Sequence, residues 1–365
     1  MSDSLLASAL EARRQGGKGL LRQFSEVCAL RLGSTKLGPS EYYFYRLFDG
    51  RLSREQRSRF AGFRLERRLD EVLNRKTWWA LANDKLLFYQ TLEGVGIDYP
   101  PLRAAYVPVR RCSRSALLSS ADEITAFLRS PSSYPMFMKP LQGSYGRGAC
   151  SAVSYDATRD TIRLGNGENW QLSDAVRDVM EPRCRGYLFQ ELVESHETLR
   201  ERSGPTLSSA RVVVLLNGNA TTVLRCTWKV PTGRNMVDNF IHGTSGNLLA
   251  QVEPEYGEVR RVVRGVGLAQ QEVLTHPDTG RPLTGFKLPD WRKVRELCLD
   301  GASAFPGLRL QHWDVALGQN GPKVLEMNVQ GSLDLHQLSS LEGIFDDDLR
   351  QIVHDAELNG TGRRR

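Results

Sequence analysis

The 365-residue sequence is 40% hydrophobic, enough for one large domain or two smaller ones, each with its own core. Its net charge of +7 suits anionic ligands, but without a lysine block or an aromatic-basic repeat neither nucleic acid nor a membrane surface is the expected main partner. The six cysteines lack C-x-x-C spacing, which argues against a zinc site and a disulfide framework. The sequence shows neither a secretory leader nor a run of ~20 apolar residues. These features predict a cytoplasmic protein without a membrane span.

The first part of the chain, residues 1–80, reads as a set of basic helices. Within 52–83, apolar residues recur at three- and four-residue spacing between charged ones, the pattern of helices that bury one face. A further helix is predicted over 84–95, DKLLFYQTLEGV, with Asn83 or Asp84 as its N-cap. We therefore expect a helical N-terminal extension whose charged faces are solvated.

Beyond residue 100 the sequence changes to short strands. A strand at 103–107 precedes a helix that Ser120 can cap, and an amphipathic helix is predicted over 288–305. The turns NGN and GQNG separate paired apolar runs, which indicates antiparallel hairpins. The expected β-rich segments are 136–141, 149–155, 160–165, 187–193, 210–230 and 308–329, and the expected regions are 1–80, 81–190, 191–340 and a C-terminal helix with a basic tail over 341–365.

The stretch MFMKPLQGSYGRGACSAV, residues 136–153, combines a lysine in an apolar strand with a glycine loop. Walker and Rossmann loops both need a helix after the glycines, whereas here the chain continues as a strand. Such a loop can still fold over phosphates, because Gly143, Gly146 and Gly148 let backbone N–H groups point inward. Ser144 would add a hydroxyl and Lys139 a point charge. A plain hairpin with a loose turn explains this stretch equally well.

The stretch HWDVALGQNGPKVLEMNV near the C-terminus predicts a metal site. With the turn near Asn320, Asp314 lies opposite Glu326, and Asn328 shares their face because side chains alternate along a strand. Two facing carboxylates repel each other unless a cation lies between them, and Mg²⁺ takes oxygen ligands of this kind together with substrate phosphates. The alternative is the polar side of an edge hairpin.

Lys139 with its glycine loop, followed by the Asp…Glu-x-Asn hairpin, resembles the ATP-grasp superfamily over roughly residues 80–340. The resemblance implies an α+β fold in which two lobes with antiparallel sheets clamp ATP, with Mg²⁺ as the metal. Segments such as QELVESHETL and MVDNFIHGTSGN narrow it to the sugar-transfer-associated branch. The implied ATP contacts are Lys85 at the phosphates, Gln190, Glu191 and Val193 at an adenine hinge, and Glu197 at the ribose.

The resemblance further implies ligation of a small carboxylate to an amine through an acyl phosphate, with substrates that we expect to be anionic. Arg211 or Arg225 would contact the γ-phosphate or a substrate carboxylate. The run Gln311–Trp313 lacks the arginine that D-alanine–D-alanine ligases carry ahead of the metal aspartate, so Asp238, Asn239 and His242 are candidates for the second substrate. An ATP-grasp kinase for a sugar or lipid-linked hydroxyl and a non-catalytic accessory protein of glycan assembly remain alternatives, and the oligomeric state stays open, a homodimer included.

Overall fold

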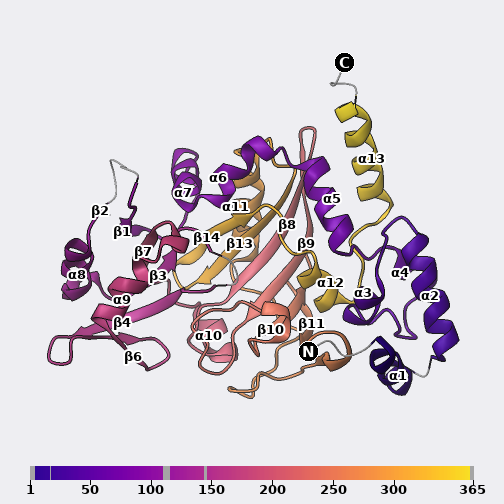
Figure 1. Cartoon of the computed structure of the whole chain (residues 1–365), viewed down its shortest axis with the longest axis horizontal. Helices are drawn as coiled ribbons and strands as arrows, with labels where there is room; N and C mark the ends of the chain where they lie inside the picture. The colour runs from indigo at the N-terminus through magenta and orange to yellow at the C-terminus, as the bar shows by residue number, and fades with distance from the viewer. Residues whose placement is uncertain (1–4, 17, 110–115, 144–145, 362–365) are drawn as a thin grey trace.

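The computed structural model describes residues 5–16, 18–109, 116–143 and 146–361. The molecule contains two seven-stranded sheets; the second lies in the middle, with the first sheet on one side of it and the N-terminal helices on the other (Figure 1). Apart from the parallel pair of β1 and β2, neighbouring strands in both sheets are antiparallel. The predicted α+β class is thus confirmed. None of the helices in the described part of the chain has the length and apolar character needed to cross a bilayer.

The first sheet carries the lysine and the glycine loop of the 136–153 stretch. Two amphipathic helices, α8 (Ala121–Arg129) and α9 (Leu172–Val179), bury their apolar sides in one core with its strands. Ser120 caps α8, as predicted, by accepting a hydrogen bond from the backbone N–H of Glu123. In sheet order the strands are β2 (Ala116–Leu118), β1 (Leu102–Tyr106), β7 (Tyr187–Glu191), β3 (Met136–Pro140), β4 (Cys150–Asp156), β5 (Thr161–Leu164) and β6 (Asn169–Gln171).

The second sheet carries the predicted metal hairpin, and the register of that hairpin is confirmed. Asp314 pairs with Glu326 across β13 and β14. The largest core of the protein joins this sheet to α7 (Lys85–Gly94), which Asp84 caps, and to α11 (Trp291–Ser303). In order the strands are β12 (Gln271–Glu272), β11 (Val259–Arg264), β10 (Leu248–Val252), β9 (Ala220–Val230), β8 (Ser209–Asn217), β13 (Leu310–Gly318) and β14 (Gly321–Asn328).

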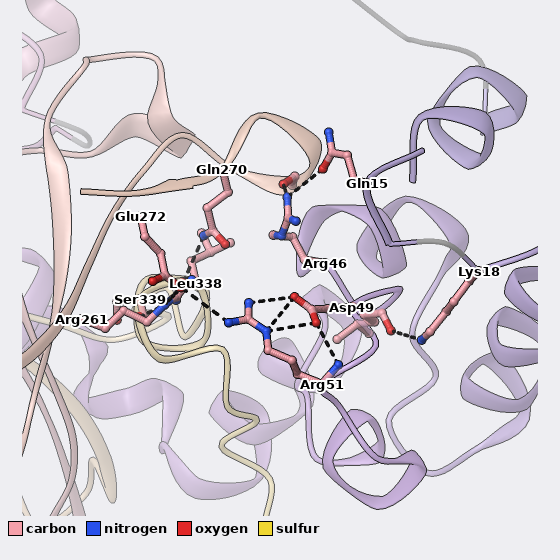
Figure 2. A network of polar contacts seen from close by, with 12 residues as sticks. Gln15, Lys18, Arg46, Asp49, Arg51, Arg261, Gln270, Glu272, Leu338 and Ser339 are labelled. Atoms are coloured by element: carbon pink, nitrogen blue, oxygen red, sulfur yellow. Dashed lines mark hydrogen bonds and ion pairs between the residues drawn. The ribbon is translucent and has the colours of Figure 1, made fainter. Parts of the chain in front are cut away.

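The N-terminal helices dock onto the second sheet through apolar and polar contacts. Figure 2 shows the polar part: Arg46 Nη1 donates to the Gly267 carbonyl at 2.9 Å, and Arg51 lies 3.8 Å from Glu272, to which Arg261 also donates. The remaining helices are α1 (Leu5–Gly16), α2 (Leu20–Leu32), α3 (Pro39–Phe44), α4 (Arg54–Ser58), α5 (Phe63–Leu73), α6 (Trp79–Asn83), α10 (Glu197–Ser203), α12 (Asp334–Ser340) and α13 (Asp347–Thr361).

Candidate active site

A cavity of about 1010 Å³ lies between the two sheets. The first sheet contributes β3, the end of β7 and the glycine loop, and the second contributes β8, β9, β13 and β14. Most of the residues proposed from the sequence meet here. Those that line the cavity are Lys85, Lys139, Gly143, Gly146, Gln190, Glu191, Val193, Arg211, Asp238, Asn239, His242, Asp314, Glu326 and Asn328.

A buried group of alternating charges forms the floor on the second sheet. Arg211 donates from Nε and Nη2 to the two oxygens of Asp314, the latter at 2.7 Å. Lys229 Nζ lies 3.3 Å from Asp314 Oδ2 and 3.2 Å from Asp238 Oδ1. Ser209 holds Asp238 in place by donating from both its backbone N–H (2.7 Å) and its hydroxyl (2.6 Å). Each buried charge therefore has an opposite charge beside it.

The pKa values in this group follow from burial and from the neighbouring charges. Burial by itself would raise the pKa of Asp314, but the charges of Arg211 and Lys229 outweigh it and hold that pKa below its usual range. Burial likewise opposes the charge of Lys229, yet Asp238 and Asp314 raise its pKa. The pKa of Asp238 is raised, mainly because the side chain is buried. Asp314 is thus an ionised carboxylate, as a metal ligand must be.

The metal hairpin is formed as predicted, but repulsion between its carboxylates does not require a metal. Protein cations already neutralise each carboxylate: Arg211 and Lys229 contact Asp314, and Lys85 Nζ lies 3.8 Å from Glu326. A metal is therefore not needed to make the pairing tolerable. The donor set still suits Mg²⁺, because Glu326 is partly exposed and Asn328, which donates to it at 3.4 Å, has a carbonyl oxygen to offer.

Lys139 is buried at the base of the glycine loop and joins three elements. Its Nζ donates to the Tyr89 hydroxyl at 2.7 Å and to the Leu325 carbonyl at 3.3 Å, linking β3 to α7 and β14. The Tyr89 hydroxyl in turn donates to the Leu325 carbonyl at 2.7 Å. Burial lowers the pKa of Lys139 to about 8. The side chain thus has structural contacts of its own in addition to any contact with phosphate.

The glycine loop closes onto a segment of the second lobe. Gly146, at φ +69°, lies so near Asn239 that an added Cβ would stand 2.5 Å from its Oδ1. Gly148, at φ +74°, accepts a hydrogen bond from the Tyr187 hydroxyl through its carbonyl and does not line the cavity. Only glycine adopts such backbone angles without strain, so two of the three glycines are explained. Ser144 lies outside the described residues.

The predicted adenine hinge lies at the end of β7. Glu191, Val193 and the buried Gln190 all line the cavity, and the Gln190 side-chain amide donates a hydrogen bond to the Pro100 carbonyl at 2.9 Å. Gln190 therefore also supports the hinge. Glu197, expected at the ribose, begins α10 and is not among the residues lining the cavity, and its backbone N–H donates to Gln319.

His242 and Asp334 form a pair at the cavity. His242 Nδ1 lies 3.3 Å from Oδ2 of the buried Asp334, whose hydrogen bond raises the imidazole pKa. Three successive residues have positive φ: Ile241 at 47°, His242 at 49° and Gly243 at 80°. Such conformations cost energy for non-glycine residues and concentrate at functional sites. This observation favours a role for His242 at the second substrate.

Arg225 is the arginine that the structure does not bring to the cavity. It shares a sheet face with Arg211, but it lies further along β9, where α12 covers the sheet through a 2.7 Å contact between Thr227 and His336. Its guanidinium instead lies 3.8 Å from Asp346. Sequence reasoning also missed Lys229, although it carries the signal that identified Lys139, a lysine inside an apolar strand.

The chain is similar to several solved structures. Solved structures of similar fold include an L-amino acid ligase from Bacillus licheniformis (13% identity, TM-score 0.39, covering 76% of this chain and 49% of that chain) and a D-alanyl-alanine synthetase A from Vibrio cholerae (13%, 0.42, 77% and 66%). An N5-carboxyaminoimidazole synthase from Aspergillus clavatus is a third (11%, 0.43, 81% and 58%). The chain therefore spans about half to two thirds of the lengths of these proteins.

Among curated protein sequences none matches this chain. The sequence model of one family does match, over residues 64–353, which begin inside α5 and include both sheets and the whole cavity. By this match over most of its length, the chain belongs to the sugar-transfer associated ATP-grasp family.

Proposed function

We propose that the protein is an ATP- and Mg²⁺-dependent ligase that joins a carboxylate to an amine through an acyl phosphate and releases ADP. The observation that carries this proposal is the set of four cations in one cavity, Lys85, Lys139, Arg211 and Lys229, arranged around the metal hairpin. Phosphoryl transfer depends on positioning and on neutralising the charge that spreads over the phosphoryl oxygens. Three of these cations are on strands and Lys85 is at the start of α7, so regular secondary structure positions all four charges.

The residues of the cavity divide into three proposed roles. Lys85 and Lys139 bind the phosphates of ATP, and the glycine loop covers them. Asp314, Glu326 and Asn328 would hold Mg²⁺, which when bound would supply positive charge beside the phosphates. Arg211 uses Nε and Nη2 for Asp314, so its Nη1 group is the one that we expect to contact the transferred phosphoryl group.

The second lobe offers room and polarity for the other substrates. The cavity volume of about 1010 Å³ lies at the upper end of the ~300–1,000 Å³ usual for one small-molecule site, which supports ATP together with a second ligand. Asp238, Asn239 and His242 line its wall away from the hinge and are proposed to contact the carboxylate or the amine. His242, oriented by Asp334, is suited to accept a proton from the attacking amine.

The test is product analysis with a trap for the activated acid. The protein is incubated with Mg-ATP, pooled small carboxylates, pooled sugars as hydroxyl acceptors and hydroxylamine, and the products are identified by mass. We expect ADP, phosphate and a hydroxamate. Release of AMP would show adenylation, and phosphate retained on a hydroxyl acceptor would show a kinase. Either result would overturn the proposal.

A further inference from the structure

The second helix of the chain turns an apolar stripe outward. Leu21, Phe24 and Leu32 on α2 are 87%, 69% and 80% exposed. Their spacing of three and then eight residues puts them on one face of the helix. The opposite side of α2 contains the buried Gln23 and Leu30. Isolated exposed leucines are common, but a stripe along one helix face marks an interaction surface.

The neighbouring helix α1 adds exposed apolar side chains. Leu6 and Leu10, one helical turn apart, are 63% and 43% exposed, and α1 packs against α2. We call the exposed residues of these two helices the α1–α2 face; its large apolar members are Leu5, Leu6, Leu10, Leu21, Phe24 and Leu32. Together they are a concentration of large exposed apolar side chains. The two helices that carry them lie at one end of the molecule (Figure 1).

On α1 and α2 the exposed charges are mainly positive, whereas the acidic residue of α2 is turned inward. Glu26, the acidic residue of α2, is turned inward, where Lys18 and Arg57 lie 3.0 and 3.2 Å away and the Tyr42 hydroxyl donates to it at 2.6 Å. The exposed charged side chains are mainly basic. They are Arg13, Arg14, Arg22, Arg31 and Lys36, with the partly exposed Glu11 as an acidic neighbour.

The net positive charge of the chain is concentrated in the N-terminal region. Residues 1–80 contain 16 Lys and Arg against nine Asp and Glu, a net charge of +7 that equals the net charge of the entire chain. Residues 81–365 are therefore neutral overall, with 33 residues of each sign. The basic character belongs to the extension and not to the lobes that form the cavity.

The inner side of the N-terminal helices packs against the second sheet and is therefore not available to a partner. Arg46 and Arg51 connect it to the second sheet, as Figure 2 shows, and its buried aromatic residues share a core with that sheet. We propose that the α1–α2 face docks on the surface of a bilayer containing anionic phospholipids. Apolar side chains ringed by arginine on short helices enter the boundary between headgroups and acyl chains, while the arginines attract anionic lipid. Against a second copy of the chain, the same face would bring like charges together.

The test is flotation of the full-length protein with vesicles of phosphatidylcholine containing about one third phosphatidylglycerol, compared with phosphatidylcholine alone. We expect the protein to float with the anionic vesicles and binding to weaken steeply as salt is raised. Replacing three apolar residues should lower partitioning by about tenfold for each side chain. These replacements are Leu21→Gln, Phe24→Gln and Leu32→Gln combined, and the matched control replaces the exposed Val109, Tyr256 and Leu274 by Gln.

A second pair of variants isolates the charges. Both remove four positive charges from exposed arginines, so their net charges are equal. Only the variant in the α1–α2 face should lose its preference for anionic vesicles. The proposal would be overturned if the wild type did not float with the anionic vesicles, or if the two arginine variants floated with them equally. It would also be overturned if the protein bound no vesicles but formed a dimer that the Leu21→Gln, Phe24→Gln and Leu32→Gln variant dissociates. The variant in the α1–α2 face changes Arg13, Arg14, Arg22 and Arg31 to Gln. The control variant, outside that face, changes Arg159, Arg177, Arg183 and Arg292 to Gln.

Discussion

Replacing Glu326 by Gln tests the metal hairpin without disturbing the fold. The Glu326 side chain is 31% exposed, and its ion partner, Lys85, lies 3.8 Å away. A partly exposed pair of this kind is worth about 0–1 kcal/mol, so Glu326→Gln should remain folded. Asp314→Asn would be a poorer test, because it leaves Arg211 and Lys229 buried without their partner, at a cost of about 3–5 kcal/mol.

The expected loss is in metal-dependent nucleotide binding. Removing a charge-assisted contact to Mg²⁺ should cost about 1.5–3 kcal/mol, or roughly tenfold to hundredfold. The measurement is calorimetric ATP affinity as a function of Mg²⁺ concentration. Without Mg²⁺ the variant should bind ATP at least as well as the wild type, because it has lost one negative charge near the phosphates. The comparison of the two conditions therefore separates metal binding from nucleotide binding.

The matched control is Glu258→Gln. Glu258 pairs with Arg260 at the same distance, 3.8 Å, on the second lobe but outside the cavity. Its Mg²⁺ dependence should equal that of the wild type. Overlapping Mg²⁺ curves for the wild type and Glu326→Gln would refute the reasoning and show that the hairpin is a scaffold.

Three further predictions concern the phosphate end and the N-terminal helices. ATP affinity should fall by about tenfold per pH unit above pH 8, because Lys139, with its pKa lowered to about 8, loses its proton there; equal affinity at pH 7 and 9 would contradict this. Gly146→Ala should weaken ATP binding by about tenfold, from left-handed strain and contact with Asn239, whereas Gly143→Ala, with ordinary contacts only, should bind within about twofold of the wild type. Burial raises the pKa of Glu66 to about 8, so between about pH 4.3 and 8 Glu66 ionises in the unfolded chain but not in the folded one, and the fold loses stability as the pH rises. The Glu66→Gln variant should therefore be more stable than the wild type by about 1–3 kcal/mol at pH 7 and by less at pH 5, as measured by urea unfolding. Equal gains in stability at the two pH values would contradict this prediction.

Local patterns were sufficient for several parts of the site. The register of Asp314 and Glu326 follows from strand alternation and from the position of one turn, and both are readable within 20 residues. Lys139 stands out because it is a lysine within an apolar strand directly ahead of a glycine loop. The cap at Asp84 likewise depends on its nearest neighbours.

Other assignments needed contacts that no local pattern reveals. Arg225, like Arg211, stands in a β-strand among apolar residues. Its part of the sheet is covered by α12, however, and its guanidinium pairs with Asp346 outside the cavity. Glu197 begins a helix outside the cavity lining, although it is close in sequence to the hinge. Asp334 stands in no recognisable motif and reaches His242 only because the chain folds back between positions 242 and 334.

The sequence by itself determined the alternation of the strands, the hairpin register, the helix caps and the glycine-bearing turn, because each depends on residues within a few positions of one another. Tertiary structure decided which cations meet which carboxylates. Arg211 reaches Asp314 across 103 positions, and Lys139 reaches the Leu325 carbonyl across 186. The pairing within the buried charges depends on the order of strands in the second sheet, and the closure of the cavity depends on how the two sheets face each other. Both are set by packing of apolar surfaces far apart in sequence, which no short pattern encodes.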